Sequence, residues 1–276
     1  MSESPASAFE EPVRILSDLH LAHPASQIDR VESLRPLIGG ARTVIFNGDT
    51  CEQSCVDWTE EGEARLGELL ELCSQEGAAP VFLAGNHDPE ITARGWLDLA
   101  GGKILVTHGH AIYPGVAPWT HEYLFRKKEI LRMVEERRCA EADLAYHWET
   151  TRTITQALKP DRARNLGRMG RNYLLSAAWP PERCFNILRV WLTMVDMANQ
   201  FVQRFRPKTE VFFFGHFHRA GIWQRDDRII CNTGAFMRGA RPLVGDLSDG
   251  WLRMFSVDKA NGEYHLDGAQ TTILVA

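Results

Sequence analysis

The chain has 276 residues, of which 44% are hydrophobic and 24% are charged, and its formal net charge is −5 at pH 7. This composition is typical of a soluble globular protein, and no stretch approaches the roughly 20 apolar residues that a membrane-spanning helix needs. The first eleven residues contain three glutamates and no apolar run, which argues against a signal peptide. We therefore expect a cytoplasmic protein, and we expect its six cysteines to be reduced because only one close pair occurs among them.

The first predicted strand, Val13–Leu16, runs directly into polar residues. Asp18 and His20 lie two positions apart, so both side chains point to one side of an extended backbone. A carboxylate and an imidazole on one side form half of a divalent metal site, although an Asp-x-His pair also arises by chance. His23, three residues later, is expected to be a loop residue.

The second predicted strand, over 44–47, leads into Gly48 and Asp49 and follows a helical stretch over 28–37. Its β-branched and aromatic residues are typical of a buried strand. Gly48 permits a tight turn, so Asp49 is expected to point into the crevice outside the strand ends, where open α/β sheets bind ligands. Taken alone, a Gly-Asp pair more often marks a plain turn.

The third predicted strand, over 80–84, follows a helical pattern over 60–73 and ends in Gly85-Asn86-His87-Asp88. Asn86 offers a neutral amide oxygen, a hard metal ligand that adds no negative charge where a phosphate must bind. His87 offers an acid or a hydrogen-bond donor beside it. Gly-Asn is also a common turn, but the His-Asp that follows is unusual for one.

Two further predicted strands, over 103–107 and 211–214, end in histidines. The first delivers His108-Gly109-His110, and the second delivers Gly215-His216-Phe217-His218. A single histidine is more often an ordinary surface or core residue than a ligand. Five strand ends that carry such residues in succession instead indicate one shared site.

These five stretches resemble the motif set of the calcineurin-like metallophosphoesterases, over 13–107 and 211–231 of this chain. The resemblance implies an α/β fold, a two-sheet β-sandwich flanked by helices, in a single domain over 1–276. It also implies a dinuclear metal site. The first metal would be held by Asp18, His20, Asp49 and His218. The second would be held by Asn86, His108 and His216, with Asp49 bridging both.

The resemblance places His87 at the family's non-ligand catalytic histidine. The family often pairs that histidine with an acid three residues after the bridging aspartate, and here that position is Glu52, one methylene longer. Asp88 is a second candidate partner. The turn Asn232-Thr233-Gly234 resembles the family's polar turn that lines the site.

The predicted ligands contain nitrogen and oxygen but no thiolate, which suits Mn²⁺, Fe or Zn²⁺, and we expect two divalent ions, with Mn²⁺ favoured. Two cations about 4 Å apart bind phosphoryl oxygens and lower the pKa of a bridging water toward neutrality. His87 would stabilise charge on the phosphoryl oxygens or protonate the leaving oxygen. We therefore predict a metallophosphoesterase that hydrolyses a phosphate ester or a pyrophosphate, with hydroxide as nucleophile and no phosphoenzyme.

The middle of the chain is expected to form a helical insertion over about 115–208. It is predicted to hold three or more helices, among them 121–148 and 182–205, and the latter has a broad apolar face. This face either packs against the neighbouring helices and the body or belongs to a lid over the metal site.

Positive charge is concentrated in the same region. Residues 119–208 carry 17 Lys and Arg against 10 Asp and Glu, a net +7, whereas the rest of the chain carries 14 against 26, a net −12. Two groups contribute: Arg126, Lys127, Lys128 and Arg132, and then Arg162, Arg164, Arg168 and Arg171. Solvated helix faces are the default explanation, but the asymmetry also favours an anionic partner, either a phosphate-containing small molecule or a lipid head group. Nucleic acid is less expected because the aromatic residues here fall at core spacing.

One subgroup of the family, the UDP-2,3-diacylglucosamine pyrophosphatases of lipid A synthesis, has a similar size and a helical insertion between the same two motifs. Those enzymes commonly carry arginine at the position of His87, so this chain departs from their pattern. A lipid substrate would place the protein at the inner face of the membrane. The rival functions are a nuclease, whose binding would depend on salt, and a non-catalytic metal-binding protein. The chain ends with a predicted hairpin around Asn261 and Gly262.

Overall fold

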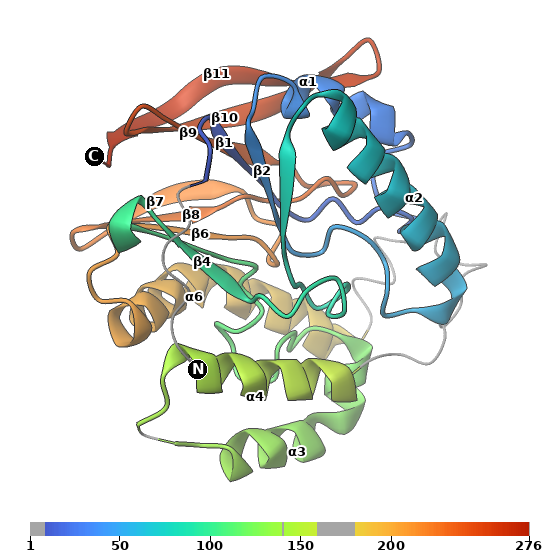
Figure 1. Ribbon diagram of the computed structural model, residues 1–276. Helices are drawn as coiled ribbons and strands as arrows, with labels where there is room; N and C mark the ends of the chain where they lie inside the picture. Colours follow the sequence, from blue (N-terminus) through green and yellow to red (C-terminus); the bar gives the residue numbers. More distant parts are fainter. Residues whose placement is uncertain (1–8, 140, 159–179, 276) are drawn as a thin grey trace.

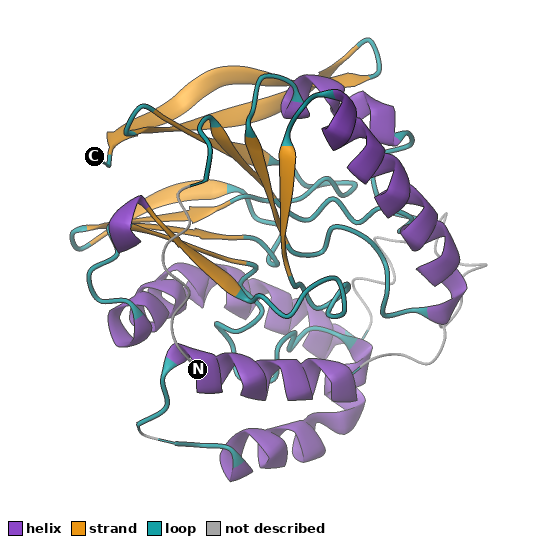
Figure 2. Ribbon diagram, in the orientation of Figure 1, coloured by secondary structure: helices purple, strands orange, loops and turns teal. Residues whose placement is uncertain are grey.

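The computed structural model describes residues 9–139, 141–158 and 180–275 (Figure 1). Two β-sheets pack face to face, and helices cover the outer face of each (Figure 2). The predicted α/β class, two sheets flanked by helices, is confirmed. Within the described residues, no helix combines the length and the apolar character needed to cross a bilayer.

The first sheet has six strands in the order β11-β10-β9-β1-β2-β3. Its parallel strands are β1 (Val13–Leu16), β2 (Thr43–Asn47) and β3 (Ala79–Leu83). Its antiparallel strands are β9 (Leu243–Ser248), β10 (Trp251–Ala260) and β11 (Glu263–Leu274). β1 and β2 are buried along their whole length, and their sequences are apolar apart from Arg14, Thr43 and Asn47. The predicted C-terminal hairpin is present as β10 and β11.

The second sheet has five strands in the order β4-β5-β6-β8-β7. They are β4 (Trp96–Leu99), β5 (Ile104–Thr107), β6 (Val211–Phe214), β7 (Gly221–Arg225) and β8 (Arg228–Asn232). β5, β6 and β8 run parallel, and β4 and β7 are antiparallel edges. β5 and β6 are neighbours although the insertion separates them in sequence, so the ends that carry their histidines lie side by side.

The two sheets and their helices pack through three apolar layers, one between the sheets and one on the outer face of each sheet. Ile15 and Ile45 of the first sheet pack against Val106 and Phe213 of the second. The outer face of the first sheet is covered by η1 (Val31–Leu34), α1 (Arg35–Ile38) and α2 (Val56–Gln75). The helix expected over 28–37 is thus only a 3₁₀ turn and one short helical turn. The carboxyl ends of the inner strands consequently meet between two firmly packed sheets.

The insertion contains α3 (His121–Glu136), α4 (Leu144–Ala157) and α6 (Pro181–Phe205). The single stretch expected over 121–148 is two helices, because Asp143 caps α4 by accepting the N–H of Tyr146 at 2.8 Å. The C-terminal half of α6 packs on the second sheet, whereas its N-terminal half exposes Phe185 (65%), Leu188 (55%) and Leu192 (70%). The expected apolar face is therefore only partly buried. The predicted group Arg162, Arg164, Arg168 and Arg171 lies outside the described residues.

Candidate metal centre

The loops after β1, β2, β3, β5 and β6 converge at one end of the two sheets. Asn47, the last residue of β2, joins the sheets by donating from Nδ2 to the carbonyl oxygen of Thr107 at 3.0 Å. Asn232, in the predicted polar turn, donates to the carbonyl oxygen of Gly215 at 2.8 Å and so holds the loop after β6. The structure thus brings together residues from five strand ends that are distant in sequence.

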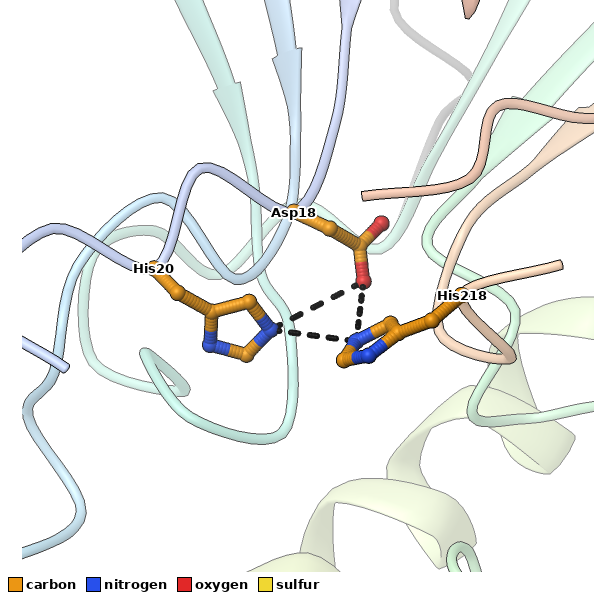
Figure 3. A group of neighbouring side chains, drawn as sticks. All are labelled: Asp18, His20 and His218. Carbon is orange, nitrogen blue, oxygen red and sulfur yellow. Dashed lines mark hydrogen bonds and ion pairs between the residues drawn. The ribbon is translucent and has the colours of Figure 1, made fainter. Parts of the chain in front are cut away.

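The first cluster consists of Asp18, His20 and His218, whose side chains point toward one another (Figure 3). Nε2 of His218 lies 3.2 Å from Oδ1 of Asp18 and 3.2 Å from Nε2 of His20. One ligand atom from each residue lies within 4.8 Å of the others. A divalent cation among these atoms would satisfy both facing ring nitrogens and the buried carboxylate together.

The second cluster consists of Asp49, His108 and His216, all buried. Oδ2 of Asp49 lies 3.2 Å from Nε2 of His108 and 3.6 Å from Nε2 of His20. The Asp49 carboxylate of the second cluster therefore also lies beside His20 of the first, as a bridging ligand would.

Several buried atoms of the predicted ligands of the second metal lack a hydrogen-bond partner among the described residues. They are Oδ1 of Asn86, Nε2 of His108 and Nδ1 of His216. A buried polar atom without a partner costs about 1–3 kcal/mol. These unpaired atoms all belong to predicted ligands of the second metal, so the donor set fits a hard or borderline divalent cation.

For three of the four histidines among the predicted ligands, a neighbouring acceptor fixes which ring nitrogen carries the proton. Nδ1 of His108 donates to the carbonyl oxygen of Asn47 at 3.0 Å, and Nε2 of His216 donates to that of Val116 at 3.1 Å. Nδ1 of His20 donates to Glu52 at 3.0 Å. In each neutral ring the other nitrogen is then unprotonated and can bind a metal. Hydrogen-bond acceptors commonly orient metal-binding histidines in this way.

Backbone strain is concentrated at the predicted ligands. Five of the seven have positive φ although none is glycine: Asp18 (54°), His20 (48°), Asp49 (50°), His216 (67°) and His218 (52°). Such conformations cost on the order of 1–3 kcal/mol each and cluster at functional sites. Two glycines allow the close approach that these turns need, since a Cβ at Gly85 would overlap Asp49 and a Cβ at Gly215 would overlap Asp18.

Glu52 connects His20 to His87. Its Oε1 accepts from Nδ1 of His20, and its Oε2 accepts from Nδ1 of His87 at 2.9 Å. Burial opposes ionisation of Glu52, but His87 and His20 keep its pKa far below the usual range. Burial likewise opposes protonation of His87, yet Glu52 and Asp49 raise the pKa of His87 to about 10. The second candidate partner, Asp88, instead accepts backbone N–H groups of Asp49, Thr50 and Gly85.

Two features of the site had not been expected from the sequence. His23 lies against the rings of His20 and His87, although it had been expected to be only a loop residue. Burial lowers the pKa of His23 to about 3. Val116, at the start of the insertion, supplies the carbonyl oxygen that holds His216. The spacing of His23 from His20 was a usable signal, whereas no pattern of side chains could reveal a backbone acceptor.

Three of the four basic residues of α3 make ion pairs within the insertion. Arg126 binds Glu129 at 2.7 Å, Lys127 binds Glu182 at 3.2 Å, and Arg132 lies 3.4 Å from Glu136. These charges are partly neutralised, so they give little support to an anion-binding role for α3.

The chain matches no protein-family model and no curated protein sequence. Among solved structures it is similar to zinc-bound Vps29 from Entamoeba histolytica, at 14% identity over 96% of this chain and 99% of that one, with a TM-score of 0.44. It is similar to a dimetal phosphatase from Danio rerio, at 11% identity over 96% of this chain and 100% of that one, with a TM-score of 0.43. It is also similar to the phosphoesterase Yfce from E. coli, at 14% identity over 96% of this chain and 99% of that one, with a TM-score of 0.42.

Proposed function

We propose that the chain is a dinuclear metal-dependent phosphoesterase of the calcineurin-like type. The observation that carries this proposal is the pair of ligand clusters on either side of Asp49, with ligand atoms in the second cluster that are buried and unpaired. A structural metal site in a binding protein would not require the additional Glu52–His87 pair beside it. That pair supports an enzyme over a non-catalytic metal-binding protein.

When bound, two divalent cations, with Mn²⁺ our first expectation, supply Lewis acidity toward a phosphoryl group and an activated water. Asp18, His20, Asp49 and His218 would hold one, and Asn86, His108 and His216, with Asp49, the other. His87 donates from Nδ1 to Glu52, which leaves Nε2 to donate to a phosphoryl or leaving-group oxygen. Glu52 keeps His87 oriented for that donation.

The proposal is tested with protein that has been stripped by a chelator and then reloaded with Mn²⁺. Metal content and hydrolysis of p-nitrophenyl phosphate and of bis(p-nitrophenyl) phosphate are measured. His87→Ala is expected to lose at least about 3 kcal/mol of transition-state stabilisation, by analogy with loss of one well-placed donor. His265→Ala, an exposed histidine of β11, is the matched control. Wild-type protein that binds no metal and hydrolyses neither ester would refute the proposal.

A second candidate concerns the substrate. Phe185, Leu188 and Leu192 expose apolar side chains along one face of α6, which favours a substrate with a long apolar part. This supports a UDP-2,3-diacylglucosamine pyrophosphatase-like activity, in a cytoplasmic protein that works at the inner face of the membrane. Leu188→Ser is then expected to slow hydrolysis of UDP-2,3-diacylglucosamine but not of p-nitrophenyl phosphate. No hydrolysis of the lipid by the wild type would end this candidate and leave the phosphoesterase proposal intact.

A further inference from the structure

His23 lies beside the candidate metal centre without belonging to its ligand set. Its ring centroid is 5.8 Å from that of His20 and 6.3 Å from that of His87. On another side it packs edge to face on Trp58 of α2 at 5.0 Å. The imidazole is therefore held between the wall of α2 and the two histidines that Glu52 connects.

The turn that carries His23 fixes the orientation of its ring. Nδ1 of His23 accepts the backbone N–H of Ala25 at 3.0 Å, and the backbone N–H of His23 donates to the carbonyl oxygen of His20 at 3.0 Å. Ala22, which precedes it, has a φ of 73°, a strained value for a residue other than glycine. The turn therefore holds the imidazole in one position relative to His20.

The same hydrogen bond decides where the proton of the ring resides. Because Nδ1 acts as the acceptor, the ring is neutral and its proton is on Nε2, which lies across the ring from Ala25. Among the residues that the structure describes, no group accepts from Nε2, and this atom is not one of the buried unpaired atoms. Nε2–H of His23 is thus an accessible donor at the margin of the site.

A neutral donor suits this position. Beside the positively charged His87, a neutral N–H can stabilise negative charge on a phosphoryl oxygen without adding further positive charge near the metal ligands. The ring centroids of His23 and His87 are 6.3 Å apart, so a phosphate group beside the two rings can accept a hydrogen bond from each of them.

We propose that His23 is a substrate-binding residue whose Nε2–H donates to a phosphoryl oxygen of the substrate, on the side of the site where His87 lies. This inference rests on the proposed phosphoesterase function and adds a residue that contacts the phosphate but not the metals. The alternative is that His23 only stabilises its own turn through Nδ1.

Substitution by asparagine separates the two roles. An asparagine side chain accepts the backbone N–H two residues later, so His23→Asn keeps the hydrogen bond to Ala25 and removes Nε2–H. In Mn²⁺-loaded protein we expect an unchanged Tm and metal content, a kcat/KM lowered about 100-fold, and an inhibition constant for inorganic phosphate raised at least about tenfold. His265→Asn, at an exposed position of β11, is the matched control and should leave all of these values unchanged.

Each outcome bears on the proposal. If His23→Asn keeps the wild-type kcat/KM and phosphate inhibition while His23→Ala lowers Tm, His23 is only a turn residue and the inference is overturned. Wild-type protein with neither bound metal nor turnover overturns the proposed function and this inference with it. If His23→Asn fails to fold, ¹⁵N NMR of the Zn²⁺-loaded wild type decides. Added inorganic phosphate should then shift the Nε2–H signal of His23, and an unmoved signal would overturn the inference.

Discussion

Replacing Glu52 by glutamine tests whether the two histidines on either side of it act as a unit. The carboxylate is buried, and each of its oxygens accepts one imidazole N–H, from His20 at 3.0 Å and from His87 at 2.9 Å. Glutamine has nearly the same shape but presents one acceptor and one donor. One of the two histidines must therefore turn an unprotonated Nδ1 toward the new amide. His20 does so by moving its proton to Nε2, and His87 does so by giving up one of its two ring protons.

Either result of that change damages the site. If His20 changes tautomer, the Nε2 atom in the first ligand cluster becomes protonated and cannot bind a cation. If His87 changes instead, its ring becomes neutral and the positive charge beside the phosphoryl site is lost. A hydrogen bond to a charged group contributes about 1.5–3 kcal/mol, and loss of an outer partner of a metal ligand typically costs 10–100-fold in affinity or activity. We therefore expect Glu52→Gln to lower kcat/KM by about 100-fold, or about 2.7 kcal/mol.

The assay measures kcat/KM for p-nitrophenyl phosphate and the Mn²⁺ content of wild type, Glu52→Gln and Glu52→Asp. Aspartate keeps the charge but is one methylene too short to reach both rings, so its kcat/KM should lie between those of the other two proteins. Glu68→Gln, on the exposed face of α2, removes the same charge without touching the site and serves as the control. A Glu52→Gln protein with wild-type metal content and kcat/KM within a factor of about two would show that the His20–Glu52–His87 connection is dispensable.

Three more predictions address the metal site. Gly215→Ala places a Cβ on the carboxylate of Asp18, so elemental analysis should show loss of metal, whereas Gly67→Ala, with nothing within 4 Å, should retain it. His218→Ala should lower bound Mn²⁺ from two ions to one per chain, and two retained ions would contradict the ligand assignment. In metal-free protein, Asp49 and Asp18 overcome burial and raise the pKa of His108 to about 9. The contribution of protonated His108 to the free energy of unfolding is complete below pH 6.5 and is lost by about pH 9. The Tm of the chelated protein should therefore fall across that interval.

The strands that carry the ligands could be predicted because each is a short apolar run that ends in glycine or a polar residue. β9 was not predicted, although it lies between β10 and β1. Its sequence contains Gly245 and Asp246, which break an apolar pattern. The structure explains both: Asp246 pairs with Arg14 at 2.8 Å, and a Cβ at Gly245 would lie 2.9 Å from the ring of Phe213. Such compensation between distant residues leaves no local signal.

The candidate site also has features that could be predicted from the sequence and features that could not. The candidate ligands could be proposed from the sequence because their chemistry is carried by side chains at recognisable spacings. The protonation of each ligating histidine was not, because it depends on acceptors such as the carbonyl oxygens of Asn47 and Val116. These are backbone atoms, identical at every residue, and only the folded chain determines where they point. Val116 was least accessible to prediction, since a β-branched residue rarely adopts its φ of 67°.

Val116 also changes how the insertion should be understood. Its carbonyl oxygen accepts the proton of His216, and the ring of Trp119 lies 5.0 Å from that histidine. Farther along, Trp148 of α4 packs on His110 at 5.0 Å, and His110 adjoins His108 at 5.3 Å. The insertion thus forms one wall of the second ligand cluster. Because a cation bound there stabilises only the conformation in which His216 is correctly held, metal binding and ordering of this wall are thermodynamically linked. A chain without the insertion would for that reason lack one wall of the candidate second metal site.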